Sequence, residues 1–247
     1  MEDILKKIDL LKNTLDQHRP LTGLILQQLK EYYRIGLTFS SNALEGNTLT
    51  ESETKVVIEE GITIGGKSLR DHLEAIGHAQ AHDHIYLLLE KKISEEDVLH
   101  LHKLFFLKID AENAGQYRKT NVIITGTDYL PPDHQKVPDL MKRHISNVNK
   151  KPGSQHPLIR AADLHAEFES IHPFVDGNGR IGRLLLSLLT IKHGYCPVVI
   201  PPIRRAEYIQ AMKRANKKDL EPLRKLIGSV VYEELKSLKR ILSKLVP

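Results

Sequence analysis

The sequence contains a single cysteine, Cys196, among its 247 residues, so no disulfide bond can form within the chain. No run of apolar residues is long enough to span a bilayer. The first residues lack the basic start and apolar core of a signal peptide, and the chain has no internal repeat or low-complexity linker. These absences predict a globular, cytoplasmic protein that does not bind a membrane.

The chain also has no large excess of positive or negative charge. The chain has 36 lysines and arginines against 31 acidic residues, for a formal net charge of +5. The basic residues are mixed with acidic ones, as is typical of solvated helix faces. No helix-turn-helix pattern with a concentrated basic face occurs, so we do not expect a nucleic-acid partner. The hydrophobic fraction of 40% is ordinary for a globular protein, and the length is sufficient for a full core.

Apolar residues recur at helical spacing along most of the chain, which predicts an all-α fold. Thr50 with Glu53, and Ser94 with Asp97, form patterns that cap the start of a helix. We expect helices at about residues 4–15, 24–40, 50–61, 69–91, 94–109, 137–149, 158–170, 179–193, 204–216 and 220–245. Residues 41–46 either end or extend the second helix. The helices fall into an N-terminal part (1–90), a core (91–230) and a C-terminal helix end (231–247), which together form one compact unit.

Residues 121–130 are the one segment that predicts a strand pair. The β-forming residues Val122, Ile123 and Ile124 come first, and Gly126 with Thr127 fits a turn. Two prolines at 131–132 then end the pattern. The sequence therefore predicts one β-hairpin within an otherwise helical fold.

Residues 172–183 read His-Pro-Phe-Val-Asp-Gly-Asn-Gly-Arg-Ile-Gly-Arg and have the composition of a phosphate site. Gly177 and Gly179 allow backbone N–H groups to approach an anion closely. The apolar run 184–191 follows at once, so the loop is expected to open a helix whose positive end faces the same anion. Arg180 and Arg183 would lie on one face of that helix and hold further phosphates.

Two other side chains of this stretch predict chemistry beyond binding. Asp176 is suited to a divalent metal ion, and the imidazole of His172 can take a proton near neutral pH. The glycines also fit a dinucleotide fingerprint, but that motif requires a preceding strand and an acidic residue about 20 positions later, and both are missing here. A Walker A loop is excluded because no Gly-Lys-Ser/Thr follows. A simple turn that caps a helix is the remaining alternative.

The chain has 13 histidines, several of them in residues 72–84. His78 and His82 have the spacing of a zinc pair on a helix, but no HExxH pattern and no cysteine or acidic partner accompanies them. We therefore expect the histidines of this segment to lie at the surface or in an interface. His165 is expected on an inward helix face with a structural role.

Residues 172–183 match the signature of the Fic family, HPFx[D/E]GNGRxxR, at every fixed position. Residues 115–118, the predicted hairpin and the prolines at 131–132 resemble the target-binding flap of that family and its flanks. Residues 41–46 resemble its inhibitory motif, [S/T]xxxE[G/N]. The resemblance covers about residues 21–227. It implies a helical enzyme that transfers AMP from ATP to a serine, threonine or tyrosine hydroxyl of a target protein and releases pyrophosphate.

The resemblance also assigns roles to individual residues. His172 would be the general base, and Asp176 would bind Mg²⁺. The nucleotide would be held by Gly177, Asn178, Gly179, Arg180, Arg183, Tyr208 and Asn216, the last two lining the adenosine pocket. Many relatives have a second aromatic residue after the position of Tyr208, whereas this chain has Ile209, which leaves the stacking of the base and the choice of nucleotide open.

In the inhibitory motif, Glu45 is expected to pair with Arg183 and draw it away from the γ-phosphate, with Ser41 fixing the helix. The enzyme would then rest in an autoinhibited state. A target protein would dock on the flap, residues Val122, Ile123, Ile124, Thr125 and Gly126, through main-chain hydrogen bonds. Self-modification and a homodimer through the N-terminal or histidine-rich helix are further expectations.

Three alternative functions stay open. The first is removal of AMP from a target, and the second is transfer of UMP or another phosphate-containing group. The third is a non-catalytic module that senses a nucleotide. An intact His172 and Asp176 favour an enzyme, because a module that only binds has no need for a base.

Overall fold

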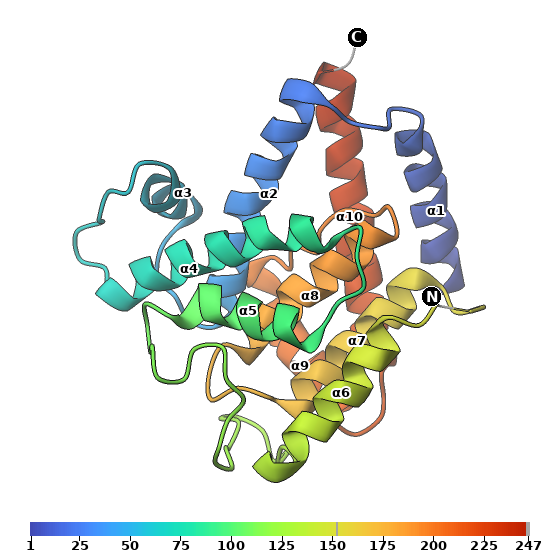
Figure 1. Cartoon of the computed structure of the whole chain (residues 1–247). Coiled ribbons are helices and arrows are strands. Elements are labelled where there is room, and N and C mark those ends of the chain that lie inside the picture. The colour runs from blue at the N-terminus through green and yellow to red at the C-terminus, as the bar shows by residue number, and fades with distance from the viewer. Residues whose placement is uncertain (152, 246–247) are drawn as a thin grey trace.

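The computed structural model describes residues 1–151 and 153–245 of the chain. The described residues form ten α-helices and three short 3₁₀ helices, and none of these helices is both long and apolar enough to cross a bilayer (Figure 1). The α-helices are α1 (Glu2–Asp16), α2 (Gly23–Leu44), α3 (Glu51–Glu59), α4 (Leu69–Ile85), α5 (Glu95–Phe106), α6 (Val137–Val148), α7 (Pro157–Ile171), α8 (Asn178–Lys192), α9 (Arg205–Ala215) and α10 (Glu221–Leu245). The 3₁₀ helices are η1 (Tyr86–Leu88), η2 (His134–Lys136) and η3 (Pro202–Arg204). The predicted all-α class is confirmed.

Helix α8 lies at the centre of the molecule. Nearly every residue from its start to Thr190 is buried, which fits its apolar sequence on all sides. Helices α2, α4, α5 and α7 pack around it, and α10 packs against α1, α7 and α9. Figure 1 shows α1 and α10 side by side at one end of the molecule, away from the first turn of α8. This arrangement fixes the predicted phosphate loop on a rigid central helix.

Local capping signals set several helix boundaries. The Thr50 hydroxyl accepts the Glu53 N–H, and the Glu53 carboxylate accepts the Thr50 N–H, so α3 starts with a capping box. Ser94 and Asp97 form the same box at the start of α5. The motif at 41–46 extends α2, because the helix continues to Leu44 and the chain turns at Glu45 and Gly46. The long helix expected at 69–91 instead ends at Ile85 and is followed by η1.

The predicted β-hairpin is wrong. None of the residues 121–130 lies in a strand, and the segment is an extended loop with a turn at residues 125 and 126, where Gly126 has φ +81°. The expectation rested on β-forming side chains, but Ile123 is 81% exposed and packs against nothing that would favour a strand. A two-stranded ribbon without a third strand is only marginally stable.

The expectation of surface histidines is also wrong for most of α4. His72, His78 and His82 are buried, because α4 is covered by α2 on one side and α5 on the other. The Nδ1 atom of His78 lies 3.0 Å from the Thr38 hydroxyl oxygen. Burial lowers the pKa of His78 far below its usual range, so this imidazole is neutral.

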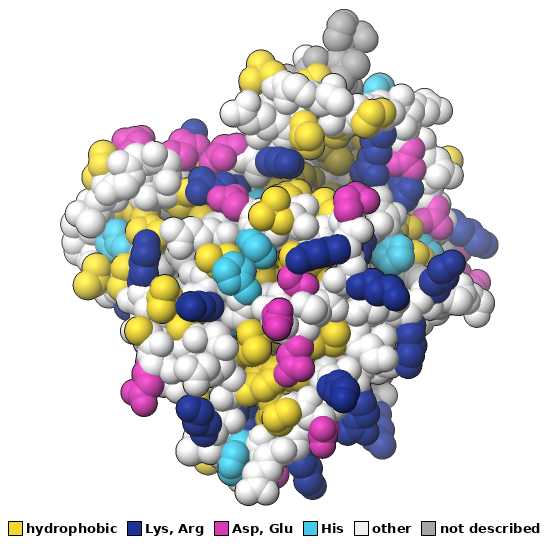
Figure 2. Space-filling model, viewed as in Figure 1, with side chains coloured by type: hydrophobic (Ala, Val, Ile, Leu, Met, Phe, Trp, Pro, Cys, Tyr) yellow, Lys and Arg dark blue, Asp and Glu magenta, His cyan; other side chains and the backbone are white. Residues whose placement is uncertain are grey.

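The charged surface fits the mixed pattern of the sequence. Figure 2 shows lysine and arginine side chains spread over much of one face, with acidic side chains between them. Ion pairs between neighbouring helix residues occur as well, as in the contact of 2.9 Å between Lys236 and Glu233 on α10. This face therefore presents separate charges rather than a single basic field.

Candidate active site

The loop between α7 and α8 is held in one conformation by its own side chains. His172 ends α7 with a left-handed backbone, at φ 51° and ψ 61°, and Gly177 precedes α8 at φ +82°. The Asn178 side chain accepts the Phe174 N–H and donates to the Phe174 carbonyl, both at 2.9 Å. The Phe174 ring is fully buried and stacks on His102 with 3.8 Å between ring centroids. The first N–H groups of α8 thus face a fixed loop.

The Asn178 amide therefore has a different position from the one expected for a phosphate ligand. Its two polar atoms are both used by the backbone of Phe174, and the residue is 2% exposed. A contact from Asn178 to an anion would come from its main-chain N–H. A Cβ on Gly179 would collide with the Glu45 carboxylate, so it is this carboxylate that lies over the first turn of the helix at Gly179.

His172 is oriented by two backbone contacts. Its Nδ1 atom lies 3.3 Å from the Glu169 carbonyl oxygen, and its own carbonyl accepts Arg118 Nε at 2.9 Å. Burial lowers the pKa of His172 below its ordinary value of 6.5. The imidazole is therefore neutral near pH 7, and a proton on Nδ1 leaves Nε2 with its lone pair free to accept one.

A cleft with a volume of about 230 Å³ lies beside this histidine and is open on one side. Its walls come from the end of α2, the loop at 124–127, the end of α7, the start of α8, and α9. The lining residues are Leu44, Glu45, Ile124, Thr125, Gly126, Thr127, Glu169, His172, Gly179, Arg183, Arg205, Tyr208, Ile209, Met212, Lys213 and Asn216. Side chains predicted separately for catalysis, inhibition, nucleotide binding and target docking thus meet in one cleft.

Other predicted site residues lie outside the wall of this cleft. Ser41 is buried behind it and contacts Arg183. Asp176 and Arg180 lie on the other side of the loop, toward α4. Val122 and Ile123 lie further along the exposed loop that contributes Ile124 to the wall.

Arg183 forms the ion pair expected with the inhibitory motif. Its Nη2 atom lies 2.7 Å from Glu45 Oε1, and the guanidinium also donates to the Ser41 hydroxyl at 3.0 Å and the Ser41 carbonyl at 2.9 Å. The Arg183 side chain is 1% exposed and packs over the ring of Tyr208. Burial acts to raise the pKa of Glu45, but the charges of Arg183 and Arg180 and the hydrogen bond from Arg183 together outweigh it, and the net shift is downward. The carboxylate is therefore ionised.

Arg180 and Asp176 belong to a second charged group. Arg180 Nη1 lies 2.8 Å from Glu74 Oε1, and Arg180 Nη2 lies 3.0 Å from Asp176 Oδ1. Asp176 also accepts the Gly177 N–H at 2.6 Å and Arg70 Nη2 at 2.5 Å. Burial acts to raise the pKa of Asp176, but the charge of Arg180 and the other donors lower it overall.

The donor set fits a magnesium ion only in part. Asp176 offers one ionised carboxylate with a side chain 41% exposed, and Mg²⁺ in nucleotide sites often uses one protein carboxylate and several phosphate oxygens. Among the described residues, no group of three or more His, Cys, Asp or Glu side chains could hold a metal ion. A metal at Asp176 would thus depend on oxygens from a bound phosphate.

The far end of the cleft is formed by α9. Tyr208 is buried, and its hydroxyl lies 2.9 Å from His165 Nε2, so His165 has the inward position that was expected. Burial lowers the pKa of His165 to about 3, which keeps it neutral. Ile209 and Met212 give the wall an apolar surface in place of a second ring.

Three residues of the site were not predicted from the sequence. Glu169 lines the cleft, and burial raises its pKa to about 8, although Arg183 acts in the opposite direction. Arg205 Nε donates to the Leu44 carbonyl at 2.7 Å and so caps the end of α2. Glu74 is the buried partner of Arg180. Each comes from a segment whose sequence shows an ordinary charged helix.

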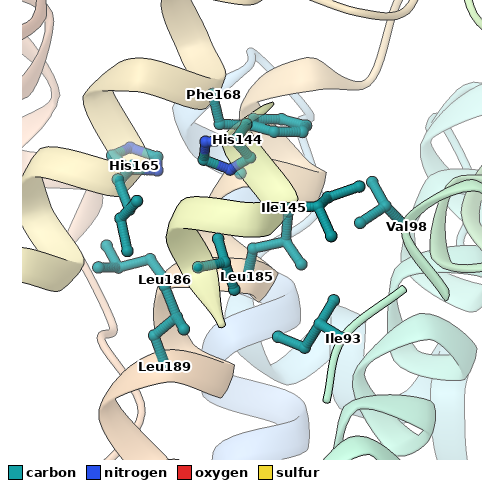
Figure 3. A pocket seen from close by; sticks show the side chains of 12 residues that line it. Ile93, Val98, His144, Ile145, His165, Phe168, Leu185, Leu186 and Leu189 are labelled. Atoms are coloured by element: carbon teal, nitrogen blue, oxygen red, sulfur yellow. The ribbon is translucent and has the colours of Figure 1, made fainter. Parts of the chain in front are cut away.

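A second hollow, shown in Figure 3, lies among the apolar side chains between the start of α5 and helices α6, α7 and α8. Ile93, Val98, Ile145 and leucines of α8 line it, together with the imidazole of His144. This hollow is a gap in the packing of the core and offers no chemistry comparable to that of the cleft.

The loop, the buried helix and its arginines place two guanidinium groups and a helix N-terminus close together, and helix N-termini with such groups suit anions. Residues 92–190 match the Fic/DOC family, so the chain contains a Fic/DOC family domain. It is 35% identical over 200 residues to "Protein adenylyltransferase Fic" of Drosophila grimshawi, which covers 80% of this chain and 41% of the relative. The protein of the same name from Drosophila melanogaster is 32% identical over 234 residues, covering 94% and 47%. The chain thus spans less than half the length of these relatives.

Solved structures show the same fold. Fic-1 from C. elegans superposes with a TM-score of 0.89 at 29% identity, covering 98% of this chain and 73% of that one. A Fic domain containing signaling protein from Bacteroides thetaiotaomicron has a TM-score of 0.84 at 26% identity, covering 93% and 95%. The likeness extends over nearly the whole chain, including the N-terminal helices that carry residues 41–46.

Proposed function

We propose that this chain is a protein adenylyltransferase that transfers AMP from ATP to a hydroxyl group of a target protein. The observation that carries the proposal is the cleft in which His172, Arg183 and the glycine loop meet. A base, a phosphate-binding helix end and a buried guanidinium are the groups that nucleotidyl transfer requires. The names of the similar Drosophila proteins support the same activity.

The reaction would proceed by in-line attack on the α-phosphate. The Nε2 atom of His172 accepts the proton of the target hydroxyl, and the oxygen forms a bond to the α-phosphorus. The bond between that phosphorus and the oxygen bridging to the β-phosphate breaks, and pyrophosphate leaves with the electron pair. Arg180 and Arg183 offset the charge that develops on the leaving group. When Mg²⁺ is bound at Asp176, it supplies further neutralisation of phosphate charge.

The same geometry supports autoinhibition. The carboxylate of Glu45 lies 2.7 Å from Arg183, and the Ser41 hydroxyl and carbonyl take the remaining donors of that guanidinium except Nη1. Arg183 is therefore neutralised by α2 and is not free to bind the γ-phosphate. Movement of Glu45 away from the cleft would release it.

The loop at 121–130 would receive the target protein. Within the described part of the chain, no hydrogen bond occupies the main chain of residues 122–126. Their N–H and C=O groups are available to an extended segment, and Gly126 lies in the cleft wall next to His172. This mode of docking positions a hydroxyl while selecting few side chains. Self-modification, a homodimer and a cytoplasmic location stay predictions from the sequence.

Labelling with ATP tests the proposed reaction. The protein is incubated with magnesium and ATP that carries the label on the α-phosphate, and in parallel with γ-labelled ATP and α-labelled UTP. Wild type, Glu45→Gly and the double variant Glu45→Gly/His172→Ala are compared. We expect strong label from α-labelled ATP in Glu45→Gly alone and none from γ-labelled ATP. Absence of protein-bound label in Glu45→Gly, with a cell lysate supplied as target, would contradict the proposal.

A further inference from the structure

Glu74 on α4 connects two parts of the site that the mechanism treats separately. Its side chain is 7% exposed, and both of its oxygens are engaged. Oε1 accepts Arg180 Nη1 at 2.8 Å and Arg70 Nε at 3.0 Å, and Oε2 accepts Asn47 Nδ2 at 3.0 Å. One buried carboxylate thus contacts a phosphate-site arginine and the segment that follows the inhibitory motif.

On the phosphate side, Arg180 depends on Glu74. The Arg180 side chain is 5% exposed, and a buried cation is stable only where carboxylates and hydrogen bonds compensate for lost water. Its other carboxylate, Asp176, is 41% exposed and is the residue assigned to the metal. Glu74 is therefore the partner of Arg180 that has no other assigned role in the reaction.

On the inhibitory side, Asn47 joins the end of α2 to α4. Its backbone N–H donates to the Asn42 carbonyl at 3.1 Å, which closes the turn that contains Glu45. Its side-chain amide donates to Glu74 and to the Asp71 carbonyl, both at 3.0 Å. Its Oδ1 atom accepts the Leu49 N–H at 3.0 Å. A shift of this turn therefore changes a contact of the carboxylate that holds Arg180.

We propose that Glu74 is a positioning residue that serves both parts of the site. Its carboxylate fixes the guanidinium of Arg180 for the leaving phosphates, and through Asn47 it anchors the turn that presents Glu45 to Arg183. The two arginines of α8 are thereby coupled to the same segment, one directly through Glu45 and one through Glu74. This inference rests on the proposed adenylyltransferase activity.

The anchoring role is tested by Asn47→Asp. The substitution keeps the size of the side chain but places a carboxylate opposite Glu74 Oε2, where two negative charges repel. We expect self-labelling to rise about tenfold over wild type, the effect of losing one hydrogen bond to a charged group. In a Glu45→Gly background the same substitution should add nothing, because the inhibitory carboxylate is already gone.

Thr48→Val is the matched control. It removes another hydrogen bond between this segment and α4, that of 2.6 Å from the Thr48 hydroxyl to Asp71, and leaves the contact with Glu74 intact. We expect this variant to label as wild type does. If Asn47→Asp also labels at the wild-type rate while Glu45→Gly labels strongly, the anchoring role is refuted. Equal activation by Thr48→Val and Asn47→Asp would refute it as well, since loss of any contact between residues 47–48 and α4 would then be enough to activate the enzyme.

The role toward Arg180 is tested by Glu74→Gln in the Glu45→Gly background. Glutamine presents one acceptor and one donor where three donors now converge, so it leaves Arg180 less well fixed. We expect kcat/KM for ATP to fall at least tenfold, with most of the loss in a higher KM, because a less well fixed Arg180 binds the phosphates of the nucleotide more weakly. A purely structural role would lower the melting temperature and leave kcat/KM of the folded fraction unchanged.

The outcome separates this inference from the proposed function. Transfer by Glu45→Gly with an unaltered kcat/KM in the Glu74→Gln double variant overturns the role of Glu74 alone. If Glu45→Gly transfers nothing, the proposed activity fails. Calorimetric titration with ATP then tests separately whether Glu74 holds Arg180 in place to bind phosphate. Binding of ATP by Glu74→Gln as tightly as by wild type would also overturn the inference, and binding at least tenfold weaker would support it.

Discussion

Replacement of Glu45 by glutamine separates the charge of the inhibitory contact from its shape. In the structure, Glu45 Oε1 accepts Arg183 Nη2 at 2.7 Å. Glutamine has the same length and retains an acceptor oxygen, whereas glycine removes the whole side chain. The glutamine variant therefore keeps a hydrogen bond from Arg183 to an uncharged acceptor and loses only the attraction between the two charges.

The size of the effect follows from the burial of the two partners. A hydrogen bond that involves a charged group contributes about 1.5–3 kcal/mol. Arg183 is 1% exposed, but the Glu45 side chain is 37% exposed, so solvent screening moves the estimate to the lower half of this range. The hydrogen bond that glutamine retains contributes about 0.5–1.5 kcal/mol, so the loss is about 1 kcal/mol, which corresponds to a rise of roughly fivefold in the population with a free Arg183.

The assay is the initial rate of self-labelling with α-labelled ATP at fixed ionic strength. We expect wild type to be slowest, Glu45→Gln to be roughly fivefold faster, and Glu45→Gly to be faster still. Glu51→Gln, which neutralises an exposed carboxylate at the start of α3, is the control and should match wild type. If Glu45→Gln labels at the wild-type rate while Glu45→Gly is strongly active, the charge of Glu45 is not what restrains Arg183.

Three further predictions concern the loop and its surroundings. In Glu45→Gly, kcat/KM should fall on the acid side with a midpoint below pH 6.5, since burial lowers the pKa of His172 and a protonated imidazole accepts no proton; a midpoint above 6.5 would refute the assignment. Burial raises the pKa of Glu169 to about 8, so folding stability should decline from pH 4.5 to 8 as the unfolded chain alone loses this proton. Glu169→Gln should remove that decline. If the melting temperature of this variant falls with pH as steeply as that of wild type across this range, the prediction is contradicted. Gly177→Ala should cost about 1–3 kcal/mol in chemical denaturation, because Gly177 has φ +82° and an added Cβ would lie 2.9 Å from the ring of Phe105; an unchanged midpoint speaks against the strain.

The helices were predictable because their signals are local. The caps at Thr50 and Ser94 and the apolar spacing within each helix place α3 and α5 with no knowledge of their neighbours. The prediction of a hairpin failed because strands depend on non-local contacts. Strands at 121–130 would need a partner surface that the fold does not provide. The prediction for the histidines of α4 failed because the sequence does not show that other helices cover α4 on both sides.

The site divides in the same way. Residues 172–183 were predictable as a group because they are contiguous and one helix start organises them. The contact of Glu45 with Arg183 spans 138 positions and was expected only through the resemblance of a short motif. Glu74 and Arg205 carry no such motif, and each is a charged helix residue whose partner lies more than 100 positions away. The packing of α4 against α8, and the contact of α9 with the end of α2, bring them into the site.

The two arginines of α8 differ in how they are neutralised, and this difference limits where inhibition can act. Arg180 has a buried carboxylate partner on α4, a helix that packs directly against α8. Arg183 has its carboxylate on the last turn of α2, where the side chain of Glu45 borders the open cleft. In the proposed mechanism, a triphosphate would enter beside Arg180 without displacing Glu74, whereas Glu45 would keep Arg183 from binding it. Inhibition at this site should therefore impair the geometry of the γ-phosphate more than the affinity for the nucleotide, and wild type should bind ATP even where it transfers little.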